Sequence, residues 1–413
     1  MHFVWEYIIA RIIDKFKITV ELNSVSLTKN EIFAPPPQSY LQLFLRFLRF
    51  GLLAWGGPVA QIAMIRQELV EEEHWISPER FNRILAVYQV LPGPEAHELC
   101  VYFGMLAKGR LGAILAGLGF MLPGFVFMFA LSWFYISYGV NSPLFAGIFY
   151  GFQSAVAALI VRAVHRIGGH ALNDRWLWGI ALFSGVAQWL GLNFLIILSL
   201  AGLIYAIVKK QTQSLPNQLA MFLPISFLSQ TAVAAAPSLL ALFVYGLRSG
   251  LLTFGGAYTA IPFLQHDAVI TGAWMTNQQF LDGLALSSIL PAPLIIFSTF
   301  VGYLGGGPLG ALVLTVGIFL PAFSFTLIGH NFFEEKFIKN KAAHAFLDGV
   351  TAGVVGLIAV TTIGLFQTAV TDLPSLGIFI TSLLALYRWK SKAIIPLVML
   401  GAGALGLFFN FIK

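Results

Sequence analysis

The sequence is poor in charged residues and contains almost no cysteine. Of its 413 residues, 10% are Asp, Glu, Lys or Arg, whereas about 25% are charged in a typical globular domain. This low charge excludes an ordinary soluble enzyme. Cys100 is the only cysteine in the sequence, which excludes an internal disulfide framework and a zinc site built from several thiolates.

Hydrophobic residues are abundant instead. They make up 58% of the chain, enough for roughly a dozen membrane spans of ~20 residues each. The formal net charge of +6 would suggest nucleic acid as a partner of a soluble protein, but here Lys and Arg occur in short clusters between apolar runs. Such clusters are typical of the cytoplasmic loops of multi-pass membrane proteins. We therefore expect an all-α polytopic protein of the inner membrane that contacts the lipid bilayer, with no nucleic acid, cofactor or metal.

Residues 1–39 differ from the rest of the chain. The apolar run from Phe3 to Ile13 is interrupted by two charged residues, so it is too short and too charged to span a membrane, and it lacks the features of a cleaved signal peptide. We expect a cytoplasmic or surface extension that ends in the Pro-rich linker at residues 35–37.

An internal repeat organises the remaining residues. At an offset of 199, the segments Leu43–Gly57 and Leu242–Gly256 match at nine of fifteen positions. After one deletion the register continues at an offset of 198. We expect a duplicated membrane domain, with repeats at 40–210 and 237–413 and a linker at 211–236.

Each repeat contains six apolar segments. They cover 40–65, 78–107, 110–138, 143–167, 175–190 and 191–208 in the first repeat, and 238–265, 277–304, 307–333, 342–367, 373–387 and 393–411 in the second. The linker adds another apolar stretch, Leu219–Ala236. Between the repeats, the clusters of positive charge shift by one loop. This shift predicts inverted-topology repeats, a cytoplasmic N-terminus and about thirteen membrane segments.

Glycine and proline interrupt two segments of each repeat. The breaks are Gly56-Gly57-Pro58 and Pro92-Gly93-Pro94 in the first repeat, and Gly255-Gly256 and Pro291-Ala292-Pro293 in the second. We expect discontinuous helices there, with Pro58 and Pro94 at the first position of a new half-helix whose free N–H groups face an anion. The alternative is a set of proline kinks tolerated for packing.

Charged residues accompany the breaks. Arg49 and Arg248 occupy the same repeat position, and two guanidinium groups could bind a tetrahedral oxyanion, unless both side chains reach the membrane surface instead. Glu95, His97 and Glu98 follow the first Pro-Gly-Pro. They are candidates for proton coupling, although Glu95 could simply stabilise a helix N-terminus.

Three motifs resemble the chromate transporter (CHR) family: FGLLAWGGPVAQI at Phe50–Ile62, LPGPEA at Leu91–Ala96 and GFMLPG at Gly119–Gly124. The weaker second copies look like the long, two-domain form of that family. The resemblance implies export of chromate, with sulfate as an analogue, and places functional residues at Gly56, Gly57, Pro58, Pro92, Gly93, Pro94 and Glu95. His97 and Glu98 stand where glutamine-like residues are expected.

Other functions fit the sequence less well. A membrane-embedded enzyme would need a nucleophile, base or metal constellation, and the polar residues of the apolar segments form no such set. A cation carrier would be expected to place carboxylates in both repeats, but Leu294 and Ile295 follow the second Pro-x-Pro. A secondary carrier for sulfate or another small anion stays open, and so does a homodimer.

Overall fold

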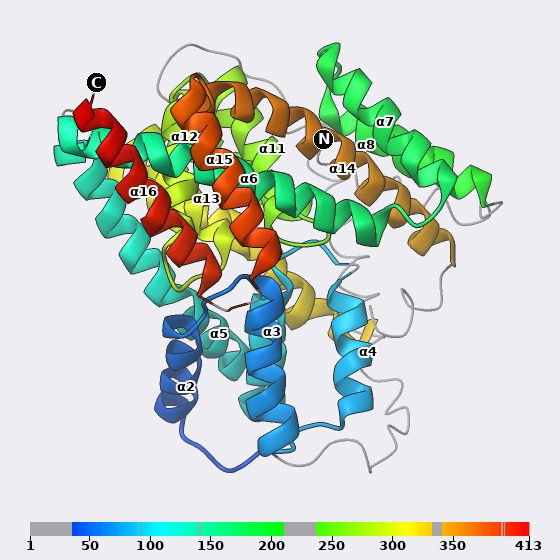
Figure 1. Cartoon of the computed structure of the whole chain (residues 1–413). Helices are drawn as coiled ribbons and strands as arrows, with labels where there is room; N and C mark the ends of the chain where they lie inside the picture. Colours follow the sequence, from blue (N-terminus) through cyan, green and yellow to red (C-terminus); the bar gives the residue numbers. More distant parts are fainter. Residues whose placement is uncertain are drawn as a thin grey trace.

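The computed structural model describes residues 35–89, 91–139, 142–209, 237–332, 341–389, 391 and 393–412 (Figure 1). These residues form helices and loops, with no β-strand among them, which confirms the expected all-α class. The predicted surface segment before residue 35 and the predicted connecting span Leu219–Ala236 lie outside the described residues.

The first repeat begins with two short helices and continues with longer ones. Its elements are α2 (Tyr40–Leu52), α3 (Pro58–Arg66), the π-helix η1 (Gln67–Glu72), α4 (Pro78–Tyr88), α5 (Glu95–Phe134), η2 (Tyr135–Gly139), α6 (Pro143–Ala171), α7 (Arg175–Trp189) and α8 (Phe194–Val208).

The second repeat has nearly the same element order. It contains α10 (Leu239–Leu251), η3 (Ala257–Ala260), α11 (Ile261–Gln265), the π-helix η4 (His266–Thr271), α12 (Asn277–Ser288), η5 (Leu294–Ile296), α13 (Phe297–Phe332), α14 (Lys341–Ala369), α15 (Leu373–Arg388) and α16 (Ile394–Ile412). The π-helices η1 and η4 are 199 residues apart, and α14 begins and ends 198 residues after α6. The sequence repeat is therefore also a repeat of secondary structure.

Both α5 and α13 contain a sharp reversal of the chain. Lys108 and Gly109 leave the helical region of φ and ψ, as do Gly306 and Gly307. Within α13, Thr299 Oγ1 lies 2.8 Å from Thr315 Oγ1, although 16 residues of straight helix would separate them by about 24 Å. Each element is therefore a helical hairpin, which agrees with the segment boundaries predicted at 107–110 and 304–307.

The chain also folds back at both Gly-Gly breaks. Arg49 forms an ion pair with Glu68, and Arg248 forms one with Asp267. Each pair is 19 residues apart, which corresponds to about 28 Å along a continuous helix, too far for an ion pair. The helices on the two sides of each break therefore lie side by side.

A similar reversal occurs at Pro92-Gly93-Pro94. Arg80 Nε, at the start of α4, donates a hydrogen bond of 3.2 Å to Tyr102 Oη in the third turn of α5. Segments 40–65 and 78–107 were expected to be discontinuous helices, and their breaks are found where predicted. They are not interrupted straight spans, however, but hairpins with the breaks at their tips.

Helices of each repeat pack against a long helix of the other repeat. In the first repeat α7 and α8 pack against α14 of the second, while α15 and α16 pack against α6 of the first. The hairpins α5 and α13 also contact each other. Figure 1 shows α2, α3 and α4 together at one end and α6 among the orange and red helices of the second repeat. The larger cluster of buried hydrophobic residues therefore contains residues of both repeats, whereas a smaller one consists of residues within 43–120 of the first.

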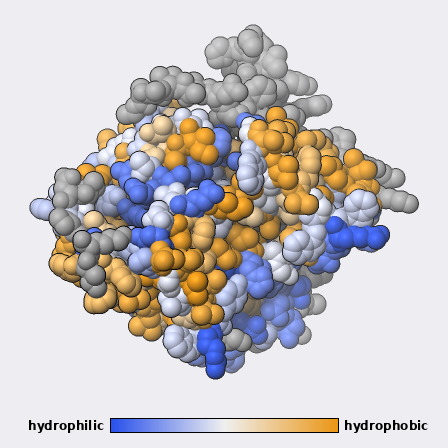
Figure 2. All heavy atoms as spheres, turned by 45° about the horizontal axis from the view of Figure 1, so that its top comes forward, coloured by the Kyte–Doolittle hydropathy of each residue, from blue (hydrophilic) through white to orange (hydrophobic). Residues whose placement is uncertain are grey.

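The outer surface suits a membrane. Five described helical stretches are long and apolar enough to cross one, Glu95–Gly139, Leu144–Ala171, Leu294–Ile328, Lys341–Ala369 and Ile394–Phe411, and three shorter apolar helices accompany them. Hydrophobic residues cover much of the face seen in Figure 2. The chain is thus a multi-pass membrane protein, while the count of about thirteen segments stays a prediction.

The close approach of α6 and α16 gives a first testable prediction. A Cβ at Gly151 would overlap the Ala402 carbonyl and lie 3.1 Å from Gly406 Cα, whereas a Cβ at Gly169 of the same helix would meet nothing within 4 Å. We expect Gly151→Ala to lower the melting temperature in detergent. Gly169→Ala should leave it unchanged or raise it slightly, because Ala favours a helix by about 1 kcal/mol. Equal melting temperatures for both variants would contradict this packing.

Candidate functional site

The tips of the four predicted breaks meet between the two repeats. The Gly93 N–H of the first repeat donates a hydrogen bond of 2.9 Å to the Thr253 carbonyl, two residues before Gly255. A Cβ at Gly93 would lie 3.2 Å from Ala322 Cβ, and one at Gly124 would lie 2.6 Å from Ala292 Cβ. Because 93 and 292, like 124 and 322, are repeat partners, these two contacts are reciprocal.

Glycine is required at the Gly-Gly tips by backbone conformation. The φ angles are 89° at Gly56, 78° at Gly57, 76° at Gly255 and 113° at Gly256, values that side chains with a Cβ rarely adopt. Pro58 occupies the first position of α3, as predicted.

Proline has a different role at the other two tips. Pro94 is the N-cap of α5, and α5 itself begins at Glu95, which corrects the prediction that Pro94 is the first helical residue. Pro293 is likewise the N-cap of the 3-10 helix η5. Both prolines therefore end a loop and do not begin a helix.

A small cavity lies where the tips meet, and we call it the tip cavity. Its volume is about 30 Å³, room for one or two water molecules. Residues of both repeats line it: Ala54, Trp55, Gly56, Gly57, Leu159, Tyr258, Ser287, Ser288, Leu290, Ala292, Leu294, Ile395 and Pro396. Of the predicted site, the cavity contains the first Gly-Gly break and part of the second Pro-x-Pro break.

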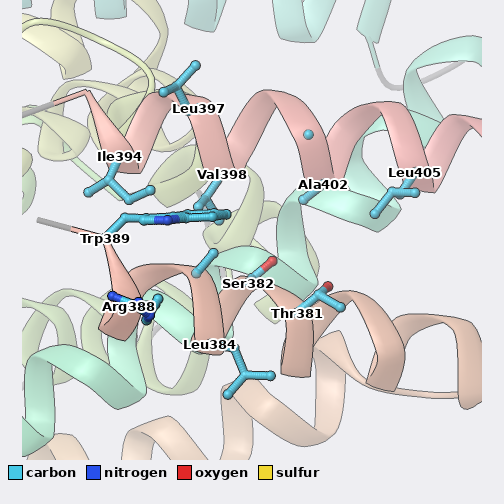
Figure 3. A pocket seen from close by; sticks show the side chains of 12 residues that line it. Thr381, Ser382, Leu384, Arg388, Trp389, Ile394, Leu397, Val398, Ala402 and Leu405 are labelled. Carbon is cyan, nitrogen blue, oxygen red and sulfur yellow. The ribbon is translucent and has the colours of Figure 1, made fainter. Parts of the chain in front are cut away.

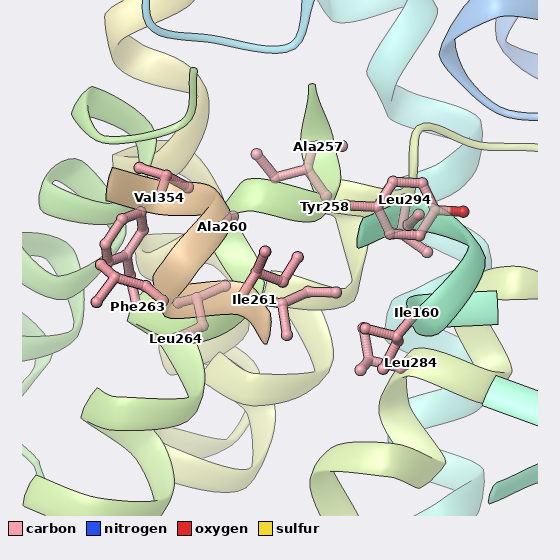
Figure 4. Packing of buried hydrophobic residues seen from close by; sticks show 14 of the residues in the cluster. Ile160, Ala257, Tyr258, Ala260, Ile261, Phe263, Leu264, Leu284, Leu294 and Val354 are labelled. Atoms are coloured by element: carbon pink, nitrogen blue, oxygen red, sulfur yellow. The ribbon is translucent and has the colours of Figure 1, made fainter. Parts of the chain in front are cut away.

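Sequence reasoning missed the polar side chains of this cavity. Tyr258 is 6% exposed, and its hydroxyl forms no hydrogen bond within the described part of the chain. In Figure 4 its ring lies beside Leu294 and its oxygen points away from the apolar cluster. The hydroxyls of Ser287 and Ser288 donate to backbone carbonyls, so their oxygens can still accept. A lone Tyr and a Ser pair in an apolar sequence gave no signal of this convergence.

Both predicted arginines are engaged by carboxylates. The Arg248 side chain is 4% exposed and that of its partner Asp267 is fully buried, whereas Arg49 is 54% exposed and shares Glu68 with Arg46. Their positive charges are therefore largely compensated inside each repeat. Direct binding of an oxyanion by Arg49 and Arg248 stays a prediction, and these ion pairs give both residues a role in holding the hairpins closed.

The three coupling candidates are buried on the first turn of α5. Glu95 is 8% exposed, and His97 and Glu98 are fully buried. The His97 ring packs edge-on against Phe319 and Phe323 of the second repeat, with ring centroids 5.0 and 4.7 Å apart. Neither carboxylate oxygen of Glu98 has a hydrogen-bond partner among the described residues. Glu98 Oε1 instead faces Gly93, at 2.8 Å from the position of a Cβ there.

One other pocket suits an anion less well. A groove of about 510 Å³ runs between α15 and α16 and is lined mainly by apolar side chains, with Arg388 as its charged residue (Figure 3). Such a largely apolar surface suits hydrocarbon chains better than a dianion. In the part of the chain that the structure describes, no three His, Cys, Asp or Glu side chains are grouped so that they could hold a metal ion. The tip cavity is therefore the better candidate.

Comparison with known proteins identifies the relatives of this chain. The family model of the chromate transporter matches residues 41–207 and 240–407. A chromate transport protein of Pseudomonas aeruginosa is 56% identical over 388 residues, which cover 90% of this chain and 93% of that protein. A probable chromate transport protein of Synechococcus elongatus is 32% identical, covering 91% of this chain and 96% of its own. No solved structure matches the chain.

The apolar helices and the relatives together define the class of this protein. A helical membrane protein whose relatives over most of its length are transport proteins is a membrane transporter and not an enzyme. The two family matches coincide with the two sequence repeats. The chain belongs to the chromate transporter family, as its motifs indicated.

The two ion pairs give a second prediction. Arg248→Met removes the guanidinium from the buried Asp267 carboxylate and leaves it with His266, 3.6 Å away, which should cost about 3–5 kcal/mol. Arg49→Met removes a half-exposed pair and should cost about 0–1 kcal/mol. We expect a much larger fall in melting temperature for Arg248→Met, partly restored by Asp267→Leu in the double variant. If both single variants keep the wild-type melting temperature but lose flux, the arginines bind substrate instead.

Proposed function

We propose that the protein exports chromate, a tetrahedral oxyanion, from the cytoplasm, with sulfate as a competing analogue. The observation that carries the proposal is the convergence of the repeated breaks on a cavity lined by Tyr258, whose hydroxyl is available to donate to an oxyanion. The hydroxyls of Ser287 and Ser288 also line the cavity, and they can donate to an oxyanion by leaving the carbonyls of Leu294 and Leu284. The names of the relatives support chromate as the substrate.

The membrane potential can drive this export. Moving one charge across 100 mV is worth about 2.3 kcal/mol, so a dianion that leaves a negative-inside cytoplasm gains about 4.6 kcal/mol. At about 1.4 kcal/mol per tenfold, this sustains a gradient of more than about 10³-fold. Uptake against the same potential would need several coupled cations. Glu95, His97 and Glu98 are the residues through which a proton would be coupled in addition.

The proposal includes two inverted repeats in the inner membrane, with a cytoplasmic N-terminus. The shift of loop charges between the repeats supports inversion, and so does the reciprocal packing of α7 and α8 on α14 and of α15 and α16 on α6. The first two predicted segments of each repeat fold back as hairpins, so each would enter and leave the membrane on the same side. This lowers the number of crossings by two in each repeat. Because the change is an even number, the two repeats keep the predicted opposite orientations.

Inversion can be tested at two equivalent turns. Lys108 and Gly306 are repeat partners at the turns inside α5 and α13. If the repeats are inverted, these two turns should lie on opposite sides of the membrane. In a Cys100→Ala background, we expect an impermeant thiol reagent to label Lys108→Cys only from the cytoplasmic side and Gly306→Cys only from outside. Labelling of both from the same side would refute inversion.

Transport can be tested in proteoliposomes with an imposed potassium diffusion potential. We expect chromate flux to increase with the potential in the direction that moves negative charge toward the positive side, and sulfate to compete. Glu95→Gln should alter any pH dependence without abolishing this response. Flux that ignores the potential would refute the electrogenic scheme. The absence of flux for both oxyanions would refute the substrate class.

A further inference from the structure

Two arginines of α6 lie on the same face of the helix as a residue that lines the tip cavity. Leu159 lines the cavity, and Arg162 and Arg166 follow it by three and seven residues. In an α-helix these three positions share one face, and the arginines lie about 4.5 and 10.5 Å further along the axis. Both therefore stand between the cavity and the end of α6 at Ala171.

The positive charge of these residues reaches the cavity. Tyr258 in its wall lies within electrostatic range of Arg162 and Arg166, and Glu95 at the start of α5 lies within range of Arg166. Tyr258 and Glu95 belong to different repeats and different elements. Arg166 is therefore close enough to interact with groups of both repeats where the tips meet, and Arg162 is close enough to interact with Tyr258.

These charges are also uncompensated. Arg46, Arg49, Arg66 and Arg248 each form an ion pair with a carboxylate. In contrast, the guanidinium groups of Arg162, which is half-buried, and Arg166, which is exposed, form no ion pair or hydrogen bond with any described residue. A free guanidinium keeps its full charge and its bidentate donors for a mobile anion.

The fold does not need charge at these two positions. The equivalent helix α14 has the same length as α6, and at the offset of 198 it has Val360 and Gly364 where α6 has Arg162 and Arg166. The same helical element is thus built without the arginines. Their presence in only one repeat is what a function on one side of the transporter requires.

We propose that Arg162 and Arg166 form an electropositive vestibule that captures a tetrahedral oxyanion dianion and delivers it to the tip cavity. This inference rests on the proposed function and assigns one of its steps, capture on the side where α6 ends. Because attraction at several ångströms depends on charge, the vestibule should raise the local concentration of the dianion and the rate of association. The effect should be screened by salt.

The test compares charge removal at the vestibule with charge removal nearby. Arg162→Gln, Arg166→Gln and the double variant are matched by Arg175→Gln, an exposed arginine at the first residue of α7. Initial rates in proteoliposomes at graded chromate concentrations should show a half-saturation concentration about 5- to 30-fold higher in the double variant, with little change in the rate at saturation. Arg175→Gln should stay within about twofold of wild type, and Arg162→Lys should retain most of the apparent affinity.

A binding measurement separates this inference from the proposed function. Calorimetric titration of the purified protein in detergent with chromate, and separately with sulfate, should show weaker binding by the Gln variants and a flatter dependence on salt. If wild type binds chromate through these arginines but does not transport it, the proposed function fails and the vestibule stands. If wild type transports chromate and the Gln variants match it in half-saturation, or if Arg175→Gln has an equal effect, the vestibule is refuted. Absence of oxyanion binding by wild type at correct fold also refutes it.

Discussion

The backbone at the chain breaks must find its hydrogen-bond partners within the protein, and the rest of the structure follows from this requirement. In a bilayer each unsatisfied backbone group costs several kcal/mol, so irregular backbone is tolerated only where protein covers it or where it lines a cavity. Here the tips cover one another, as the bond from Gly93 to the Thr253 carbonyl shows. Close approach needs small residues, and Gly124 and Ala322 stand opposite the Pro-x-Pro tips. The contacts that make the breaks tolerable also create the candidate site.

The tips around the cavity contact one another through short segments, whereas the surrounding long helices pack against each other over greater lengths. The contacts between tips include a backbone hydrogen bond, worth about 1 kcal/mol, and the methyl-sized side chains of Ala292 and Ala322. The long helices α6 and α14 instead pack along most of their length against helices of the other repeat. At about 30 Å³ the cavity is too small for a tetrahedral oxyanion. Because the tips are short segments and the scaffold interfaces are formed by long helices, we expect any opening that admits substrate to occur at the tips.

The repeat, the breaks and nearly all helix boundaries could be predicted from the sequence, because glycine, proline and apolar periodicity determine structure locally. It did not distinguish a broken span from a hairpin, since both have the same apolar runs. A signal was nevertheless present: Glu68 and Asp267 lie 19 residues after Arg49 and Arg248 in both repeats, and such a repeated spacing of opposite charges indicates a fold-back. Tyr258, Ser287 and Ser288 could not have been found, because Tyr258 and the two serines are about 30 residues apart in the second repeat and only its tertiary fold brings them to one cavity.

Comparison of equivalent positions separates groups that the fold needs from groups that are free for function. The Arg–carboxylate pair at the Gly-Gly hairpin occurs in both repeats, so it belongs to the shared architecture. The cations of α6 occur only in the first repeat, and so do Glu95, His97 and Glu98. The hydroxyls that line the cavity come from the second repeat. Val59, Tyr88 and Gln89 stand at the positions of Tyr258, Ser287 and Ser288, and the Tyr88 hydroxyl accepts a hydrogen bond from Thr326 and does not line the cavity. Duplication supplied one scaffold twice, and the two copies have since diverged in chemistry at a common centre. An anion at that centre would be attracted by the arginines of one repeat and could accept a hydrogen bond from the neutral Tyr258 hydroxyl of the other. A symmetric site with two fixed guanidinium groups would bind a dianion more tightly, and tight binding would oppose its release.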